Sequence, residues 1–532
     1  MLVRGPAIQR LDAHAAHQGR KRAHVRRVLP RKRVYGIVTE GEKQMTTAAK
    51  PRIGASPPDR HWDAIDWQAI ERQVLRLQMR IAKATREGRW GKVKSLQWLL
   101  THSFAAKLLA VRRVTQNTGR NTAGVDGIVW KTAAQKDEAA RSLQRRSYQT
   151  LPLRRVYIPK KNGKLRPLGI PAMSCRAMQA LHLQGLEPVA ETLADPNSYG
   201  FRPKRSTADA IGQCFLALRR KDCAQWIFEG DITACFDRLD HTWLQDHIPM
   251  DKLILGKWLA AGYMEEGKVF PTEAGSPQGG IASPALANMA LDGLEAVAHK
   301  AAPRNQKVHV IRYADDFCIT GASKEVLETR IKPAVVGFLK ERGLDLSEEK
   351  SRITHIDDGF DFLGFNVRKY AGTLLIKPSK AAVKRFLEDI RELIKSFATG
   401  KTAELIRQLN LKLSGWANYY RHVVAKRTFT YVDHQVFRAL RAWIKRRHPT
   451  KSALWRMNRY FRRIGQRQEV FFARVRDEFG QVNCLDLFSA ASLPIVRHVK
   501  VQALATPYDP AYADYFTDRA RRRRLSGSAA ST

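Results

Sequence analysis

The sequence of 532 residues is poor in three features that define common protein classes. It has no run of about 18 consecutive apolar residues, so no membrane-spanning helix and no membrane association are expected. Its six cysteines form no CxxC pair, which argues against a zinc ribbon or a disulfide framework. The N-terminal residues lack the apolar segment of a secretory signal, but their arginines leave a transit peptide open. We therefore expect a bacterial cytoplasmic, nucleoid-associated location, with an organelle as the alternative.

Acidic residues are scarce relative to basic ones. The chain has 93 Lys and Arg against 50 Asp and Glu, a formal net charge of +43. A field of this sign attracts polyanions, so nucleic acid is the first partner to consider and an anionic membrane surface the second. The apolar share of 44% and the 11 tryptophans indicate folded cores rather than disorder.

The patterning along the chain divides it into five regions. Residues 1–55 are rich in Arg, His and Ala without periodicity and are expected to be disordered. Apolar residues at helical spacing predict helices in a segment at 56–130, with one over residues 93–114. Short strands alternate with helices over 131–370, which favours a mixed α/β core. The regions that follow are predicted as a helical one at 381–480 and a basic C-terminal one at 481–532, whose arginine tail is expected to fray.

Three aspartates form the sharpest local signal. Asp315 and Asp316 stand side by side between two apolar stretches, which predicts a β-hairpin with adjacent carboxylates at its turn. Asp231 ends another apolar stretch, WIFEGD. Carboxylates so placed repel each other unless a cation neutralises them, and Mg²⁺ prefers such oxygen ligands. An ordinary solvated Asp-Asp turn is the alternative on these residues alone.

The motifs around these aspartates resemble, in order, those of reverse transcriptases, and among them the group II intron maturases. The matching segments are RVYIPKKNGKLRPLGIP (155–171), NSYGFRPKRST (197–207), DITACFDRLDH (231–241), GSPQGGIASPALANMALDGLE (275–295), YADDF (313–317), GLDLSEEKSRI (343–353) and FDFLGFNVRK (360–369). The resemblance implies an α+β right-hand polymerase fold. Its fingers and palm would be mixed α/β with a four-motif palm sheet, followed by an α-helical thumb (maturase domain X) and a basic C-terminal region.

The resemblance also implies roles for single residues. Asp231, Asp315 and Asp316 correspond to the catalytic acids, and together with Ile232 they are the expected site of two Mg²⁺ ions. The residues expected to contact the incoming nucleotide are Lys164, Arg166, Phe236, Gln278 and Lys350. In the family, an aromatic residue at the position of Phe236 blocks a ribose 2′-hydroxyl. A core phenylalanine, a turn-capping amide and solvated charges are the alternatives.

Beyond the palm, LNLKLSGWANYYRH (409–422) resembles the start of the maturase thumb. Residues 426–467 contain 13 Lys and Arg and one acid, with aromatic residues between them. Cations that meet phosphates and rings that stack on unpaired bases suit RNA, whereas a solvated helix face is the alternative. The predicted RNA-binding residues are Arg446, Arg447, Arg456, Arg459, Arg462 and Arg463.

The resulting hypothesis is an intron-encoded RNA-directed DNA polymerase that copies intron RNA and assists its self-splicing. Its expected partners are the group II intron RNA, target DNA and dNTPs, and a homodimer is left open. Relatives often end in an HNH nuclease with CxxC pairs, and no such pair occurs here, so no nuclease is expected. Two alternatives remain: an RNA-binding splicing factor with an inactive polymerase, and a domesticated or retron-like reverse transcriptase.

Overall fold

The computed structural model describes residues 62–159, 163, 165–276 and 279–528, with side chains to Arg522. The segment predicted to be disordered, residues 1–55, lies outside this range, as do Lys164 and Gln278. In the described part of the chain, no helix is both long and apolar enough to cross a membrane.

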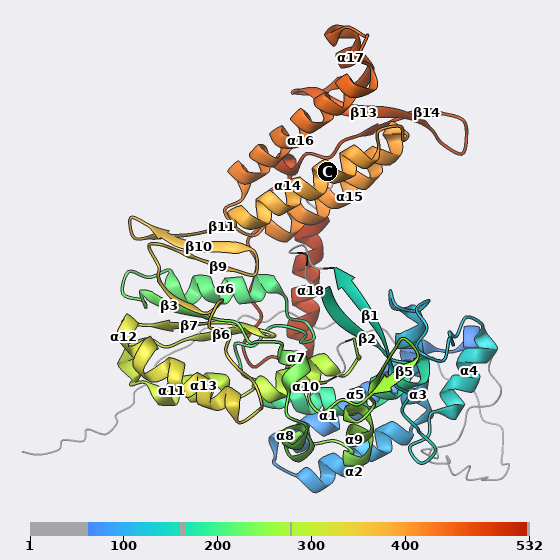
Figure 1. Ribbon diagram of the computed structural model, residues 1–532, viewed down its shortest axis with the longest axis vertical. Coiled ribbons are helices and arrows are strands. Elements are labelled where there is room, and N and C mark those ends of the chain that lie inside the picture. The colour runs from blue at the N-terminus through green and yellow to red at the C-terminus, as the bar shows by residue number, and fades with distance from the viewer. Residues whose placement is uncertain (1–61, 160–162, 164, 277–278, 529–532) are drawn as a thin grey trace, which may run out of the picture. The chain divides into compact units, whose positions relative to one another are not determined.

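Helices dominate the first part of the described chain (Figure 1). They are η1 (Trp62–Ala64), α1 (Trp67–Arg86), α2 (Trp90–His102), α3 (Phe104–Gln116), α4 (Ala133–Ser142) and α5 (Met173–Leu193). The single helix predicted over 93–114 is wrong, because Ser103 adopts an extended conformation (φ −69°, ψ 129°) that separates α2 from α3. Helix α5 packs against α1, α2 and α3 and is buried over most of its length. Its amide Gln184 donates to the carbonyl of Ala106, which ties the helices together at 2.9 Å.

A four-stranded sheet of order β2-β1-β4-β5 forms the fingers. Its strands are β1 (Leu153–Pro159), β2 (Leu165–Ile170), β4 (Tyr263–Glu265) and β5 (Lys268–Phe270). Strands β1 and β2 form an antiparallel hairpin in which Ile158 pairs with Arg166. The hairpin turn contains Gly163, whose φ of +79° is readily accessible to glycine.

A second four-stranded sheet, of order β6-β7-β3-β8, forms the palm. Its strands are β3 (Trp226–Gly230), β6 (Val310–Tyr313), β7 (Asp316–Gly321) and β8 (Arg352–His355). Side chains alternate between its two faces. Phe228 and Phe317 belong to a core with the N-terminal helices, whereas Ile227 and Cys318 belong to a second core on the opposite face. The sheet is therefore buried on both faces, and its strand ends remain for chemistry.

Short helices complete the palm and cover the sheet (Figure 1). They are α6 (Thr207–Leu218), α7 (Cys235–Arg238), α8 (His241–His247), α9 (Lys252–Leu259), α10 (Ser283–Leu291), α11 (Leu294–Ala301), η2 (Arg304–Gln306), α12 (Lys324–Val326), η3 (Leu327–Ile331) and α13 (Lys332–Lys340). Helix α6 contributes to the second core, whereas α10, α11 and α13 contribute to the first. A three-stranded sheet follows, with β9 (Phe360–Phe362), β10 (Phe365–Tyr370) and β11 (Thr373–Pro378) in the order β11-β10-β9.

The thumb begins with four helices that share a core with the strands after them. The helices are α14 (Lys380–Ser396), α15 (Thr402–Tyr420), α16 (Lys426–Arg447) and α17 (Ala453–Tyr460). The prediction that 381–480 is all helical is wrong, because β12 (Phe461–Ile464), β13 (Arg467–Arg476) and β14 (Val482–Asp486) form a sheet. Gly465 in its first turn has a φ of +55°, and the apolar run VFFA at 470–473 packs against the helices.

The C-terminal region returns to the palm. It contains η4 (Ala490–Ser492), η5 (Pro510–Tyr512) and α18 (Ala513–Ser528). Asp433, the one acid of the basic stretch, accepts hydrogen bonds from the backbone amides of Ala490 and Ala491, both at 2.9 Å. The prediction that the arginine tail frays is wrong at Arg519, which is 7% exposed and lies within α18.

Candidate active site

The palm sheet brings the three predicted acids to one edge. Asp231 follows the last residue of β3, and Asp316 begins β7. Antiparallel pairing of β3 with β7 places Gly230 opposite Phe317, so Asp231 and Asp316 lie at adjacent strand ends. Asp315 lies in the turn between β6 and β7, where Tyr313 pairs with Asp316. The structure thus forms the hairpin with adjacent carboxylates that the sequence predicts.

The hairpin turn is held by close backbone packing. Ala314 has a φ of +59°, which gives the two-residue turn its left-handed residue. Gly200 lies against it, and a Cβ at Gly200 would stand 2.3 Å from the backbone nitrogen of Ala314. The second fingers motif therefore fixes the catalytic turn through a contact that only glycine permits.

The carboxylates are close enough to perturb each other. Desolvation first, and then repulsion from Asp231, raises the pKa of Asp315. Asp316 keeps a solvent-accessible edge, yet desolvation followed by the charges of Asp315 and Asp231 raises its pKa to about 6. The charges of Arg166 and Lys350 act in the opposite direction on the pKa of Asp315. The strand edge is therefore an electronegative site that lacks enough positive charge.

Lys350 lies directly on the first of these acids. Its ammonium donates to both carboxylate oxygens of Asp231, at 3.0 and 3.2 Å. The pair is open to water, since 63% of the Lys350 side chain and 29% of the Asp231 side chain are exposed. A solvated pair of this kind is worth little, about 0–1 kcal/mol, and can be exchanged for another cation.

The backbone around Asp231 is tied to the segment that carries Lys350. The carbonyl of Asp231 accepts from the amide of Ser347 at 2.8 Å, and its amide donates to the hydroxyl of Ser351 at 3.3 Å. Ile232, counted with the metal site from the sequence, forms an isolated bridge with Leu346 and buries its side chain. This clamp fixes the position of Asp231 relative to Lys350.

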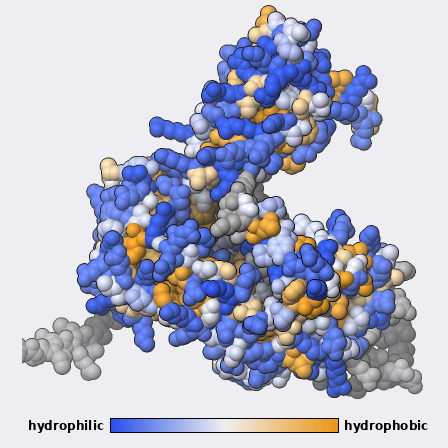
Figure 2. All heavy atoms as spheres, viewed as in Figure 1, coloured by the Kyte–Doolittle hydropathy of each residue, from blue (hydrophilic) through white to orange (hydrophobic). Residues whose placement is uncertain are grey.

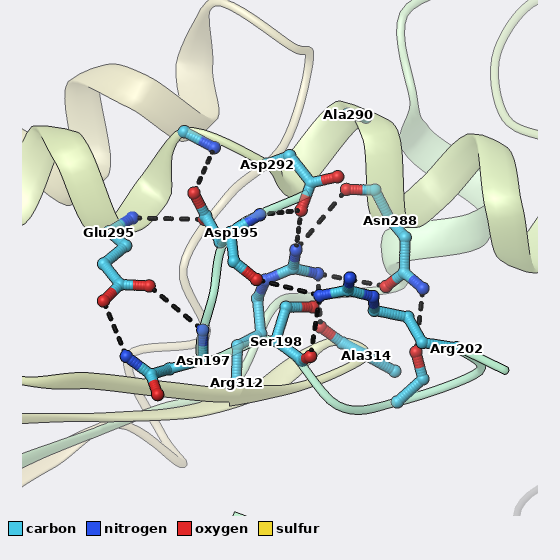
Figure 3. Close-up of polar contacts among 12 residues, drawn as sticks. Asp195, Asn197, Ser198, Arg202, Asn288, Ala290, Asp292, Glu295, Arg312 and Ala314 are labelled. Atoms are coloured by element: carbon cyan, nitrogen blue, oxygen red, sulfur yellow. Dashed lines mark hydrogen bonds and ion pairs between the residues drawn. The ribbon is translucent and has the colours of Figure 1, made fainter. Parts of the chain in front are cut away.

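A buried polar network, which sequence reasoning missed, supports the hairpin from below (Figure 3). Arg312 in β6 is 1% exposed. Its guanidinium donates to Asp292 at 2.5 Å, to the side chain of Asn288 at 3.1 Å and to the carbonyl of Ala314 at 3.4 Å. Asn288 in turn donates to the carbonyl of Gly200 at 2.8 Å. The signal in the sequence was an arginine in the middle of the apolar stretch VHVIRY.

A second ion pair extends this network. Arg202 binds both carboxylate oxygens of Glu191, at 2.8 and 2.9 Å, and each side chain is only 4% exposed. Arg202 also donates to the carbonyl of Ser198 at 3.0 Å, and Ser198 bridges to Arg312. Buried charges need such full pairing, since an unpaired one is strongly unfavourable. The loop 197–202 and the hairpin therefore form one rigid support.

The predicted nucleotide-binding residues lie around this edge where the structure describes them. Phe236 is half-buried on α7, and its ring meets that of Phe201 edge-on at 6.3 Å. The carbonyl of Phe236 accepts from the amide of Ser276 at 2.7 Å, which ties it to the loop that continues to Gln278. Arg166 is exposed on β2, and its charge reaches Asp315. The structure thus brings Phe236, Arg166 and Lys350 to the aspartates.

Three family matches cover most of the described chain. Residues 62–143 match the N-terminal domain of reverse transcriptase, residues 158–367 match reverse transcriptase (RNA-dependent DNA polymerase), and residues 383–461 match the maturase-specific domain of group II introns. Protein YkfC of Escherichia coli is 34% identical over 345 residues, which are 56% of this chain and 87% of that protein. The chain belongs to the group II intron-encoded reverse transcriptases and maturases. The family predicted from the sequence is therefore confirmed.

Other relatives fit this assignment. The group II intron-encoded protein LtrA of Lactococcus lactis is 31% identical over 357 residues, which are 54% of this chain and 58% of LtrA. The chain thus spans little more than half of LtrA. A solved structure of apo telomerase from Candida tropicalis aligns with 58% of this chain at 13% identity and a TM-score of 0.36, a likeness on which nothing further is built.

Within this group II intron maturase, the six predicted RNA-binding arginines divide into two sets. Arg446 and Arg459 are exposed on α16 and α17, with no hydrogen bond or ion pair recorded for either in the described structure. The other four have intramolecular partners. Arg447 donates to Gly400, Arg456 to His448, Arg463 to Gly465 and Arg462 to Asp486. Figure 2 shows that hydrophilic residues dominate the visible surface of these helices.

The acids of the family's polymerase site do not yet form a complete metal cage. Among the described residues, no group of three or more His, Cys, Asp or Glu side chains is arranged to hold a metal ion. The site nevertheless fits a divalent cation, because a lysine ammonium lies on Asp231 and repulsion raises the pKa values of Asp315 and Asp316. Carboxylate oxygens are the ligands that Mg²⁺ prefers.

Proposed function

We propose that this chain is an active RNA-directed DNA polymerase that copies the intron RNA and also binds that RNA to assist its self-splicing. The observation that carries the proposal is the convergence of Asp231, Asp315 and Asp316 at one edge of the palm sheet, with Lys350 on Asp231. A chain that only bound RNA would not need repelling carboxylates above a rigid buried network.

Asp231 and Asp315 are the residues that would hold two Mg²⁺ ions, with Asp316 and Ile232 beside them. When bound, such ions supply charge stabilisation for the attacking and leaving oxygens of phosphoryl transfer. The protein's own contribution is to hold the acids ionised and in place. The exchangeable ion pair of Lys350 keeps Asp231 charged, and the network around Arg312 fixes the turn of Asp315.

The dNTP is proposed to lie between the fingers hairpin and Phe236. Arg166 on β2 would neutralise part of the triphosphate, because a polyphosphate leaving group needs cations. Lys164 and Gln278, which lie outside the described residues, are proposed for the same nucleotide. The edge-on contact with Phe201 holds the ring of Phe236, which would exclude a 2′-hydroxyl. Target DNA as primer and a homodimer remain predictions.

The maturase role is proposed for the thumb. Arg446 and Arg459 extend from the basic surface of α16 and α17 and would bind phosphates directly. RNA binding through phosphates depends strongly on salt, because each neutralised phosphate releases counterions. The ribozyme itself would perform the transesterifications, while the protein holds its fold.

Primer extension on an RNA template with Mg²⁺ tests the polymerase. We expect dNTP incorporation by the wild type and its loss in Asp315→Asn, with RNA binding retained in both. No incorporation by the wild type, with RNA binding intact, would favour the splicing factor with an inactive polymerase. Loss of both functions in Asp315→Asn alone would overturn the assignment of the metal site.

A separate pair of variants tests the thumb. The double variant Arg446→Gln/Arg459→Gln should weaken intron-RNA binding and reduce the slope of log affinity against log salt by about one. The control Arg330→Gln/Arg438→Gln makes the same charge change, with one position in the palm. Equal salt slopes in both variants would return the basic surface to a merely solvated face.

A further inference from the structure

A cavity of about 700 Å³ lies outside the carboxylate site, and three segments far apart in the sequence line it. These are the start of α6, the end of α15 with the residues after it, and the C-terminal residues 496–522. None of the lining residues belongs to the three aspartates or to the predicted nucleotide site. Its size falls within the range of about 300–1,000 Å³ typical of sites for small ligands.

The cavity wall carries a surplus of positive charge. Its lining cations include Arg497, Lys500 and Arg522, with one acid, Asp518, among them. Arg497 and Arg522 are exposed. Burial, followed by the charge of Arg205, lowers the pKa of Lys500. A wall on which one cation already destabilises the charge of another favours an anion.

The nearest buried carboxylate does not balance this charge for a ligand. Asp209 is fully buried behind the wall and accepts from Arg519 at 2.6 Å, from the ring of His498 at 2.8 Å and from the backbone amide of Val501 at 2.7 Å. Its acceptor capacity is therefore spent within the fold. His422, another lining residue, is kept neutral at pH 7, because burial and the charge of His498 lower its pKa to about 4.

The cavity also offers groups that suit a nucleobase. Tyr419 and Tyr515 line it with aromatic rings, and 37% of Tyr419 is exposed. Asn418 and Gln502 supply side-chain amides. Rings that stack on bases, amides that bond base edges and cations that meet phosphates are the combination used for unpaired nucleotides.

We propose that this cavity binds a short unpaired segment of nucleic acid, with its phosphates on Arg497, Lys500 and Arg522 and a base against Tyr419 or Tyr515. The inference rests on the proposed nucleic-acid binding but not on polymerisation. Because α15, α18 and α6 all contribute, the bound strand would join the thumb, the C-terminal region and the palm. A duplex is not expected to enter, since it presents its bases only in grooves.

The test uses the full chain and a trinucleotide of RNA containing 4-thiouridine. The pocket variant is Arg497→Gln/Arg522→Gln, and the control Arg330→Gln/Arg521→Gln removes the same charge at exposed positions that do not line the cavity. We expect at least fivefold weaker binding in the pocket variant by fluorescence anisotropy, and less than twofold in the control. Photocrosslinks in the wild type should map to residues 418–422 or 512–518. Equal affinities in the two variants, or crosslinks confined to other segments, would overturn the proposal.

Matched probes identify the source of the strand. Preferential binding of the RNA trinucleotide indicates intron RNA, and preferential binding of the same sequence as DNA indicates a primer or target strand; either result supports an unpaired phosphodiester ligand. Tighter binding of a short RNA duplex than of the single strand would refute it. Primer extension by the pocket variant on a preformed primer–template should stay within twofold of wild type, which separates this site from the polymerase.

Discussion

The guanidinium of Arg312 lies 2.5 Å from the carboxylate of Asp292, in the interior beneath the turn that carries Asp315. The same guanidinium reaches the carbonyl of Ala314 within that turn. An ion pair far from solvent thus supports the one turn that the proposed chemistry cannot allow to move. Positioning of this kind is needed because small displacements of a reacting group lower the rate steeply.

Replacing Arg312 should therefore affect both stability and activity. Arg312→Met leaves Asp292 buried without its partner, and breaking a buried pair in this way costs about 3–5 kcal/mol. Thermal unfolding should shift down by several degrees, and dNTP incorporation should fall at least 100-fold. Arg330→Met, at an exposed palm position, is the control. If Arg312→Met unfolds at the temperature of this control, the network does not support the hairpin.

The contact between Gly200 and Ala314 predicts a sharp difference between two glycines. Gly200→Ala places a methyl group 2.3 Å from a backbone nitrogen, so the hairpin must shift. We expect a loss of incorporation of at least 30-fold, with RNA binding unchanged. Gly337→Ala in α13 meets no atom within 4 Å and should be neutral, or more stable by up to ~1 kcal/mol, because alanine favours the helix. Parallel effects of both substitutions would contradict the packing argument.

The ion pair between Lys350 and Asp231 predicts competition with a divalent cation. Lys350→Met removes the ammonium, so metal binding no longer has to displace it. Since an exposed pair is worth about 0.2–1 kcal/mol, Mg²⁺ should bind roughly two- to fivefold more tightly in the absence of nucleotide. Calorimetric titration measures this affinity, and the exposed Lys340→Met is the control. Unchanged or weaker Mg²⁺ binding in Lys350→Met would show that the lysine does not occupy the cation's place.

Phe236 is predicted to select the sugar. Phe236→Ala removes the ring beside Phe201 and opens space where a 2′-hydroxyl would lie. The ratio of kcat/KM for dCTP to that for CTP should fall at least tenfold, while primer–template binding stays constant. Phe215→Ala, at an exposed position on α6, should leave the ratio unchanged. A constant ratio in Phe236→Ala would reduce this ring to a core side chain.

The sequence predicted the site well where chemistry and pattern coincide. Asp231, Asp315 and Asp316 end or begin apolar strands, and antiparallel pairing leaves little choice about where they meet. The strands at 461–486 were missed, because a basic stretch with interleaved aromatics has the same composition in a helix as in a twisted sheet. The partners of Arg312 were also missed, since Asp292 and Asn288 lie on other elements and tertiary pairing leaves no local periodicity.

The C-terminal helix was misjudged for a related reason. A run of arginines reads as a solvated tail unless a buried acid awaits one of them, and Asp209 lies 310 positions away from Arg519 in the sequence. Burial alone would raise the pKa of Asp209, but the hydrogen bond from His498 and the charges of His498 and Arg519 lower it well below its usual range. This carboxylate should therefore stay ionised in the folded protein and attach α18 to α6.

Asp209→Asn should release α18 from the palm. The substitution leaves Arg519 without its buried counter-charge, so amide exchange over residues 513–522 at pH 7 should accelerate at least tenfold, while the palm strands stay protected. Because the folded pKa is lowered, the contribution of Asp209 to stability is complete above its unfolded pKa of about 3.9 and is lost as the pH falls below it. In the wild type, acidification from pH 5 to 3 should thus increase exchange in α18, whereas Asp209→Asn should show a smaller change. Asp358→Asn, an exposed acid, is the control for the loss of one negative charge. Equal exchange of α18 in wild type and Asp209→Asn at pH 7 would mean that this ion pair does not hold the helix.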